Sequence, residues 1–140
     1  MTRIFWDTNL FIYLIEDFGE FSERVVELRN RMLNRGDRLY TSTMTLGEVL
    51  VKPIEKGNQP LRLEYEDALT RGAVLLSFDS KAALRYAEIR SDRSIRAPDA
   101  IQLACASGAG MDLFITNDER LSEKDVRGIQ FICSLQRAPF

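Results

Sequence analysis

Histidine is absent from the 140-residue chain, and cysteine occurs only twice. Without histidine the chain lacks the commonest general base and the commonest transition-metal ligand, so any catalysis must use carboxylates, hydroxyls, lysines, arginines or a metal. Cys105 and Cys133 stand far apart and fit neither a disulfide framework nor the ligand spacing of a zinc site. We expect both to be small buried apolar residues of a protein in a reducing cytoplasm.

Long apolar runs are also missing. No segment approaches the ~20 apolar residues of a membrane-spanning helix, and the first residues carry neither the apolar core nor the cleavage site of a signal peptide. The composition, 45% hydrophobic and 29% charged, predicts one soluble domain with a single core and no membrane association. We place the domain at residues 1–135 and a short tail at residues 136–140.

Positive charge is in slight deficit, because the formal net charge is −2 at pH 7. The field of the whole molecule therefore does not favour polyanions. A nucleic-acid ligand would depend on local basic patches or on bound cations.

Short apolar segments alternate with segments of helical periodicity. Strands are expected at residues 4–6, 38–42, 74–78, 112–116 and 129–132, and helices at about 10–16, 21–34, 43–52, 61–70, 80–90 and 98–108. Pro53 and Gly57 should end the third helix. The alternation predicts a single-domain α/β fold, in which helices flank both faces of a mostly parallel sheet of about five strands.

Four acids stand near expected strand ends or helix starts. Asp7 closes the first strand, Asp118 follows the fourth, and Asp99 lies in the first turn of a helix. Glu48 lies in the helix entered from the second strand. Because ligands of open parallel sheets bind outside the carboxyl ends of the strands, all four can reach one edge. Taken singly, Asp7, Asp99 and Asp118 fit the roles of helix caps or first-turn acids better.

Glu48 is harder to explain as a surface residue. Apolar residues surround it on the expected helix, so its carboxylate should point inward, where no lysine or arginine at helical spacing can neutralise it. Two carboxylates about 4 Å apart repel by about 4 kcal/mol at an effective dielectric of about 20. Divalent cations would remove this repulsion, and oxygen ligands without histidine or thiolate favour Mg²⁺ or Mn²⁺. One or two such ions suit phosphodiester hydrolysis.

Polar and basic residues beside the acids extend this hypothesis. Thr8 and Asn9 follow Asp7, while Thr116 and Asn117 precede Asp118. They can orient carboxylates or metal-bound waters, although ordinary turn and cap roles explain them equally well.

The segment from residue 81 to residue 96 is the most basic part of the chain and leads directly to the acid of the next helix. We expect Arg93 and Arg96 to contact the phosphate backbone of a nucleic acid, and Arg85 and Arg90 to belong to a solvated helix face.

The N-terminal helices carry more apolar side chains than one sheet face can cover. These side chains are Phe11, Tyr13, Leu14, Phe18 and Phe21. Most should be core, and the remainder are expected to form a groove for a partner helix.

Four ordered motifs resemble those of the PIN-domain ribonucleases, and within that family the VapC-type toxins of toxin–antitoxin pairs. They are Phe5-Trp6-Asp7-Thr8-Asn9, Thr43 to Glu48, Arg96-Ala97-Pro98-Asp99-Ala100 and Ile115-Thr116-Asn117-Asp118. The resemblance implies a Rossmann-like three-layer sandwich, an Mg²⁺- or Mn²⁺-dependent endoribonuclease, and a homodimer held inactive by a small antitoxin. It assigns metal ligation and water activation to Asp7, Glu48, Asp99 and Asp118, with a supporting role for Asn9 and Thr116. The chain departs from the family at Val51-Lys52-Pro53, beside the acid of that helix.

Other functions stay open. A phosphatase with an aspartyl nucleophile commonly has a second acid two residues later, where Asn9 stands. A receiver domain could use Asp79 and Lys124, but the paired acids near its first strand are missing. An RNA-processing PIN nuclease without an antitoxin remains possible, as does a non-catalytic binding module in which the acids are merely caps.

Overall fold

The computed structural model describes residues 2–138 and contains one parallel sheet. The strands are β1 (Arg3–Trp6), β2 (Arg38–Ser42), β3 (Val74–Leu76), β4 (Met111–Thr116) and β5 (Ile129–Ser134). The helices are α1 (Thr8–Ile15), α2 (Glu20–Arg35), α3 (Thr43–Glu55), α4 (Gln59–Gly72), α5 (Ser80–Ile89) and α6 (Ala97–Ala109), with short 3₁₀ turns η1 (Leu121–Glu123) and η2 (Leu135–Arg137). Within residues 2–138 no helix is long and apolar enough to cross a membrane.

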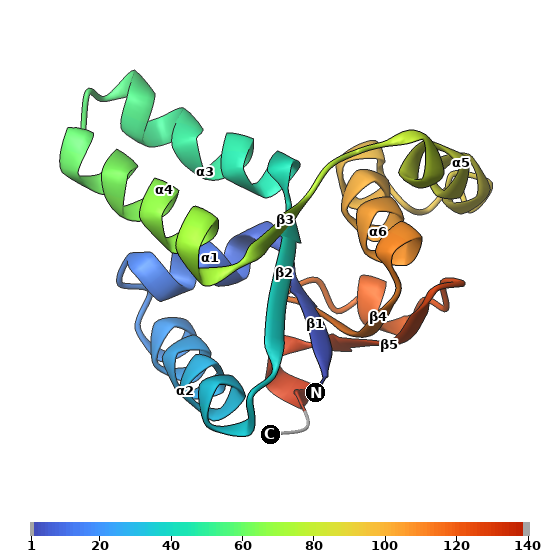
Figure 1. The fold of residues 1–140 in the computed structure, drawn as a ribbon, viewed down its shortest axis with the longest axis horizontal. Helices are drawn as coiled ribbons and strands as arrows, with labels where there is room; N and C mark the ends of the chain where they lie inside the picture. Colours follow the sequence, from blue (N-terminus) through green and yellow to red (C-terminus); the bar gives the residue numbers. More distant parts are fainter. Residues whose placement is uncertain (1, 139–140) are drawn as a thin grey trace.

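The sheet separates two hydrophobic cores. Helices α1 to α4 cover one face, and α5 and α6 cover the other (Figure 1). Along β1, Ile4 and Trp6 point to the first core, while Phe5 points to the second and stacks on Phe114 with ring centroids 4.9 Å apart. Each fully buried side chain of this kind stabilises the fold by about 1.5–3 kcal/mol. The predicted three-layer α/β sandwich is confirmed.

The strand order is β3-β2-β1-β4-β5, so the direction of winding reverses between β1 and β4. Trp6 pairs with Ile115, and the Asp7 amide donates to the Ile115 carbonyl at 3.0 Å. The carboxyl ends of these two central strands therefore open at the same point. Open α/β sheets bind ligands at such a reversal.

Helix α3 is longer than the sequence predicted. It continues through Pro53 to Glu55, and Pro53 is buried against the core. The missing proline N–H removes one bond within the helix. The last turn still closes, because the Lys56 amide donates to the Lys52 carbonyl at 3.0 Å and the Asn58 amide donates to the Pro53 carbonyl at 2.8 Å. The helix ends only before Gly57, whose φ is +64°.

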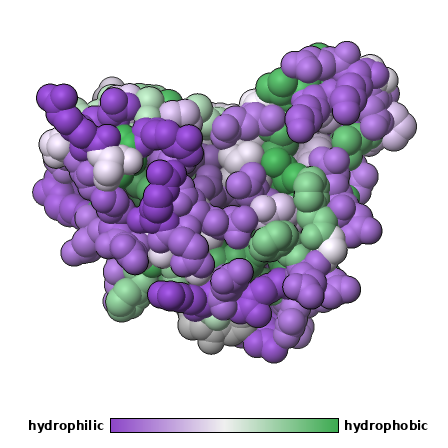
Figure 2. All heavy atoms as spheres, turned by 180° about the vertical axis from the view of Figure 1, so that it is seen from behind, coloured by the Kyte–Doolittle hydropathy of each residue, from purple (hydrophilic) through white to green (hydrophobic). Residues whose placement is uncertain are grey.

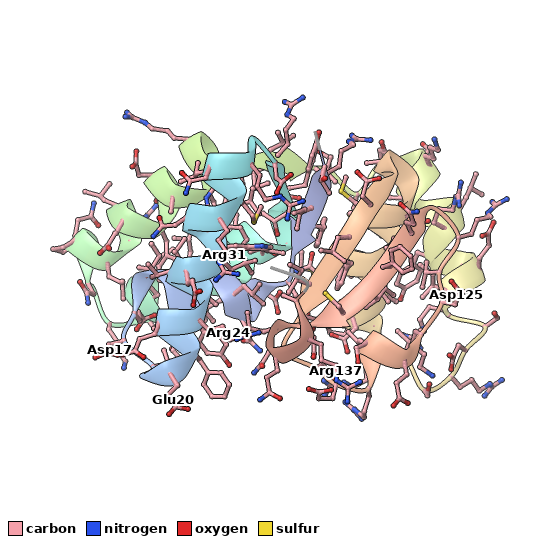
Figure 3. All side chains as sticks on the ribbon, turned by 90° about the horizontal axis from the view of Figure 1, so that it is seen from below. Asp17, Glu20, Arg24, Arg31, Asp125 and Arg137 are labelled. Carbon is pink, nitrogen blue, oxygen red and sulfur yellow. The ribbon has the colours of Figure 1, made fainter. Side chains whose placement is uncertain are left out.

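The end of the described chain is tied to α2. The Arg24 guanidinium donates to the carbonyls of Leu135 at 3.0 Å and Gln136 at 2.7 Å, and Figure 3 shows Arg24 on α2 near the C-terminal turn that carries Arg137. Residues 136 and 137 of the expected tail belong to this turn and residue 138 follows it, whereas residues 139 and 140 lie outside the described residues.

The two cysteines lie in the two cores. Cys105 is buried in α6, and Cys133 is half-buried in β5. Burial raises the pKa of each thiol to about 11, so both are protonated at neutral pH and behave as small apolar side chains.

Gly128 generates a stability prediction. Its φ is +91°, and a Cβ at this position would overlap the Ser107 carbonyl oxygen. Gly36 also has a positive φ, of +75°, but nothing lies within 4 Å of its would-be Cβ. Gly36→Ala should therefore cost only the left-handed backbone strain of about 1 kcal/mol, and Gly128→Ala that strain plus the overlap, about 3 kcal/mol. Urea unfolding of both variants measures the difference, and equal losses would contradict the proposed close approach.

Candidate active site

Asp7 lies where β1 passes into α1 and is the N-cap of that helix. Its Oδ1 accepts from the Thr8 amide at 2.8 Å, and its Oδ2 accepts from the Thr116 hydroxyl at 2.9 Å. Burial raises the pKa of Asp7 to about 6, against the lowering effect of these two bonds, and the negative charges of Asp99 and Glu48 raise it further. Asp7 is thus both a helix cap and a partly buried, charge-strained carboxylate.

Thr116 connects Asp7 to Asp118. The Thr116 hydroxyl donates to Asp7 and accepts from the Asp118 amide at 3.0 Å. The Asp118 carboxylate turns toward Arg120, whose amide donates to Oδ1 at 2.9 Å and whose Nη2 lies 3.3 Å from Oδ2. Burial acts to raise the pKa of Asp118, but the bonds and charge of Arg120 outweigh it and lower the pKa. Sequence reasoning missed Arg120, although it stands only two residues after a candidate acid.

Asp99 lies in the first turn of α6, as predicted. Burial raises its pKa, Arg96 and Arg120 act to lower it, and the charge of Asp118 raises it. Arg96 Nε lies 3.6 Å from Asp99 Oδ2, and its side chain is 70% exposed. Arg96 is therefore paired with an acid of the site and remains open to solvent. Arg93 is exposed in the loop that precedes α6.

Glu48 is exposed, so the prediction that it points inward without a partner is wrong. Helix α3 packs on the core through Thr45, Val49 and Pro53, and its other apolar residues include Val51, which is 51% exposed. Apolar residues around the whole helix therefore do not imply burial here. Glu48 Oε1 accepts from the Thr8 hydroxyl at 2.7 Å, which ties it to the residue after Asp7.

A buried polar cluster lies beneath these acids. Gln102 Nε2 donates to the hydroxyl oxygens of Thr8 at 3.0 Å and Thr45 at 2.7 Å. Sequence reasoning missed Gln102 and Thr45. A signal was available for Gln102, because it interrupts an apolar stretch of α6 three residues after Asp99 and so shares a helix face with that acid.

The comparison with known families agrees with this arrangement. The family model for the PIN domain matches residues 4–127 of the chain. The chain belongs to the PIN-domain family. The resemblance drawn from the four sequence motifs is confirmed at this level, and proteins of the PIN family are nucleases that generally use divalent metal ions.

Solved structures share the fold of this PIN domain at low sequence identity. VapBC2 from Rickettsia felis, bound to a promoter DNA fragment, matches with a TM-score of 0.71 and 14% identity over 94% of this chain and 98% of that chain. DNA-bound VapBC from Salmonella typhimurium matches with a TM-score of 0.64 and 24% identity over 96% of this chain and 99% of that chain. VapBC-1 from Haemophilus influenzae matches with a TM-score of 0.65 and 16% identity over 96% of this chain and 98% of that chain. No curated protein matches the chain in sequence.

The donor set of this PIN domain fits a divalent cation in its chemistry. Among residues 2–138 no three acids or cysteines come close enough to surround one ion. The acids nevertheless act on one another, since Asp99 and Glu48 raise the pKa of Asp7, and Asp118 raises that of Asp99. Carboxylate and hydroxyl oxygens are the ligands that Mg²⁺ and Mn²⁺ accept, and a cation would relieve this repulsion.

A cavity of about 500 Å³ lies beside Glu48, between α1, the start of α2 and α3. Its apolar lining includes Ile12, Tyr13, Phe18, Phe21, Val51 and Pro53. Tyr13 stacks on Phe21 at 5.1 Å between ring centroids. Asn9 is exposed and also lines this cavity, so the structure places it beside Glu48. Figure 2, seen from behind, shows apolar surface reaching inward below the α3–α4 end of the molecule at the upper right.

The strained carboxylate of Asp7 predicts a pH effect on the metal-free protein. Its pKa of about 6 in the folded state exceeds the ordinary value of 3.8, so the folded state binds the proton more tightly. The resulting stability is fully present below about pH 4 and is lost as the pH rises through about 6. Asp7→Asn should remove this loss and, in EDTA at about pH 7.5, raise the free energy of unfolding by up to about 3 kcal/mol.

The matched control is Asp118→Asn, measured by urea unfolding in the same buffers. The pKa of Asp118 is lowered, so its ionised form stabilises the folded state and its removal should lower stability at neutral pH. A loss of stability in Asp7→Asn at neutral pH would contradict the strain assigned to Asp7.

Proposed function

We propose that this PIN domain is an Mg²⁺- or Mn²⁺-dependent endoribonuclease and the toxin of a toxin–antitoxin pair. The observation that carries the nuclease proposal is Asp7, a half-buried carboxylate at the reversal of strand order whose pKa is raised by burial and by Asp99 and Glu48. A site that concentrates negative charge in this way is suited to cations and, through them, to phosphodiesters.

In this proposal Asp7, Glu48, Asp99 and Asp118 hold one or two metal ions. When bound, the metal would lower the pKa of a water to make the nucleophile and would stabilise the departing oxygen. Thr116 and Thr8 fix the two oxygens of Asp7, so its carboxylate cannot rotate freely. Asn9 is proposed to support the site from the cavity side of Glu48.

The arginines beside the acids supply contacts for the phosphate backbone. Arg96 and Arg120 have side chains that are 70% and 73% exposed while they contact Asp99 and Asp118. Each guanidinium can keep its carboxylate and present further N–H donors to a phosphate. We extend the RNA-binding role predicted for Arg93 and Arg96 to Arg120, which is paired with Asp118 and whose charge also acts on Asp99.

The nuclease proposal predicts that Asp7→Asn and Asp99→Asn each reduce cleavage at least about 100-fold, because supporting residues of metal sites alone account for about 10- to 100-fold. The measurement is cleavage of a mixed RNA pool by the purified protein with Mg²⁺, with Mn²⁺ and with EDTA. Asp112→Asn is the control, since Asp112 binds the Arg3 amide at the opposite end of β4 and should leave cleavage unchanged.

Three outcomes separate the candidate functions. Metal-dependent cutting that both active-site variants lose supports the nuclease. Cutting that persists in both variants would point to a contaminant or to a different site. Intact RNA together with no detectable Mn²⁺ binding would favour the non-catalytic binding module.

The toxin proposal rests on the cavity beside Glu48 and on the solved VapBC structures that share this fold. An apolar helix of a small antitoxin could place its side chains in this cavity and cover the acids at its edge. The alternative, an RNA-processing nuclease without an antitoxin, shares the same active site. The homodimer implied by the family resemblance stays a prediction that light scattering can test. We also propose that the protein acts in the cytoplasm, because its proposed substrate is RNA.

Val51 gives a sharp test of the antitoxin. It is 51% exposed and lines the cavity, so Val51→Glu should weaken binding at least about tenfold by burying a charge against an apolar partner. The partner to test is the product of any short reading frame adjacent to this gene, co-expressed and measured by calorimetry. Leu84→Glu is the control, because Leu84 is 70% exposed on α5, across the sheet. Equal effects of the two substitutions would argue against this cavity as the docking site.

A further inference from the structure

A chain of hydrogen bonds runs through the interior beneath the acids. Thr41, Ser42 and Thr45 are fully buried, and Gln102 is 2% exposed. The Ser42 hydroxyl donates to Gln102 Oε1, and the amide of Gln102 donates to Thr8 and Thr45. Gln102 thereby joins α6, which carries Asp99, to α1 and α3, which carry the residues around Asp7 and Glu48.

The direction of the Thr8 hydrogen follows from the groups around it. Gln102 Nε2 can only donate, so the Thr8 hydroxyl accepts from it at 3.0 Å, and the single hydrogen of Thr8 is left for Glu48 Oε1 at 2.7 Å. The Thr45 hydroxyl accepts from Gln102 Nε2 at 2.7 Å and lies 2.8 Å from the Thr41 hydroxyl, which also contacts the Trp6 carbonyl at 2.9 Å.

The orientation of the Gln102 side-chain amide decides where the Thr8 hydrogen points. If Oε1 faced Thr8, the Thr8 hydrogen would turn inward to that oxygen and Glu48 would lose its donor. Ser42 holds Oε1 on the β2 side, which leaves both N–H groups for the two threonines. The hydrogen of the Thr8 hydroxyl is therefore directed at the exposed carboxylate of Glu48.

We propose that Gln102 is a positioning residue that fixes the orientation of Glu48 through the Thr8 hydroxyl. The inference rests on the proposed function in that Glu48 is taken to act at the metal. Glu48 is exposed, so packing alone does not restrain its side chain, and the Thr8 bond is the contact that directs it toward Asp7. A buried amide would be costly without all of its bonds, and an apolar side chain of similar length would fill the same space.

The test uses two isosteric deletions and one conservative replacement. Gln102→Met and Thr8→Val remove the hydrogen bonds but keep the volume, whereas Thr8→Ser keeps the hydroxyl. We expect Gln102→Met and Thr8→Val each to weaken Mn²⁺ binding about tenfold and to lower kcat about 10- to 100-fold with an unchanged KM for RNA. Thr8→Ser should stay within about threefold of the wild type in both measurements.

Two further variants separate positioning from general damage to the core. Gln102→Glu offers acceptors in place of donors and should draw the Thr8 hydrogen away from Glu48, giving a loss of Mn²⁺ affinity at least as large as that of Gln102→Met. Ser134→Ala changes another buried hydroxyl, in β5, and should leave Mn²⁺ affinity unchanged. An effect of Ser134→Ala as large as that of Gln102→Met would overturn the inference.

A double-mutant cycle in EDTA keeps the inference independent of the proposed function. Gln102→Met and Glu48→Gln are combined, and the free energy of unfolding of the metal-free protein is measured. We expect the double variant to lose less stability than the sum of the single losses, because both substitutions break one chain. Additive losses would overturn the inference. Failure of the wild type to bind Mn²⁺, with the coupling intact, would instead overturn the proposed function and leave Gln102 as the residue that orients Glu48.

Discussion

The parallel pairing of β1 with β4 places a carboxylate where water is partly excluded, and the rest of the site responds to that constraint. The amide of Asp7 continues the ladder by donating to Ile115, so its side chain must leave the sheet at the point where the strand order reverses. Two hydrogen bonds, from Thr8 and Thr116, compensate only part of the lost hydration, because the pKa of Asp7 remains raised to about 6. The fold therefore maintains an electrostatic cost at one fixed position.

The remaining three acids differ in their partners and in their degree of burial, so the four carboxylates of the site are not equivalent. Asp118 is held ionised by Arg120, while Asp99 keeps a raised pKa in spite of Arg96. Glu48 has a hydroxyl partner and solvent. A cation approaching this edge would meet the exposed carboxylate of Glu48, the carboxylates of Asp99 and Asp118, each paired with an arginine, and the carboxylate of Asp7, whose burial makes it gain most from a positive charge. Each of these environments is set by the helix or strand end that carries the acid.

Much of this architecture could be predicted from sequence, because it depends on local patterns. Short apolar runs identified the five strands, and the acids after β1 and β4 were placed correctly at the carboxyl ends of these strands. The strand order, and with it the reversal between β1 and β4, was not predicted. The orientation of Glu48 could not be derived, because periodicity does not say which side of an apolar helix faces a cavity. The continuation of α3 through Pro53 and the role of Gln102 were missed for a related reason. The local pattern marks Gln102 as a polar residue on the face of Asp99, but the partners of its amide and the packing of the proline ring are distant in sequence, so no local pattern identifies them.

An acidic protein that is proposed to cleave RNA must hold its positive charge close to the acids themselves. Arg96 and Arg120 do this, since each spans a carboxylate and solvent. With a net charge of −2 the molecule offers no long-range attraction to a polyanion, so capture of the proposed RNA substrate would depend on these short contacts and on any bound cation. Their pairing also has a structural effect, because it keeps Asp99 and Asp118 from adding their full repulsion to that of Asp7. The same two side chains thus connect the stability of the metal-free fold to the proposed recognition of phosphate. A substitution that tightens the arginine–carboxylate pairs would be expected to stabilise the fold and to weaken phosphate binding.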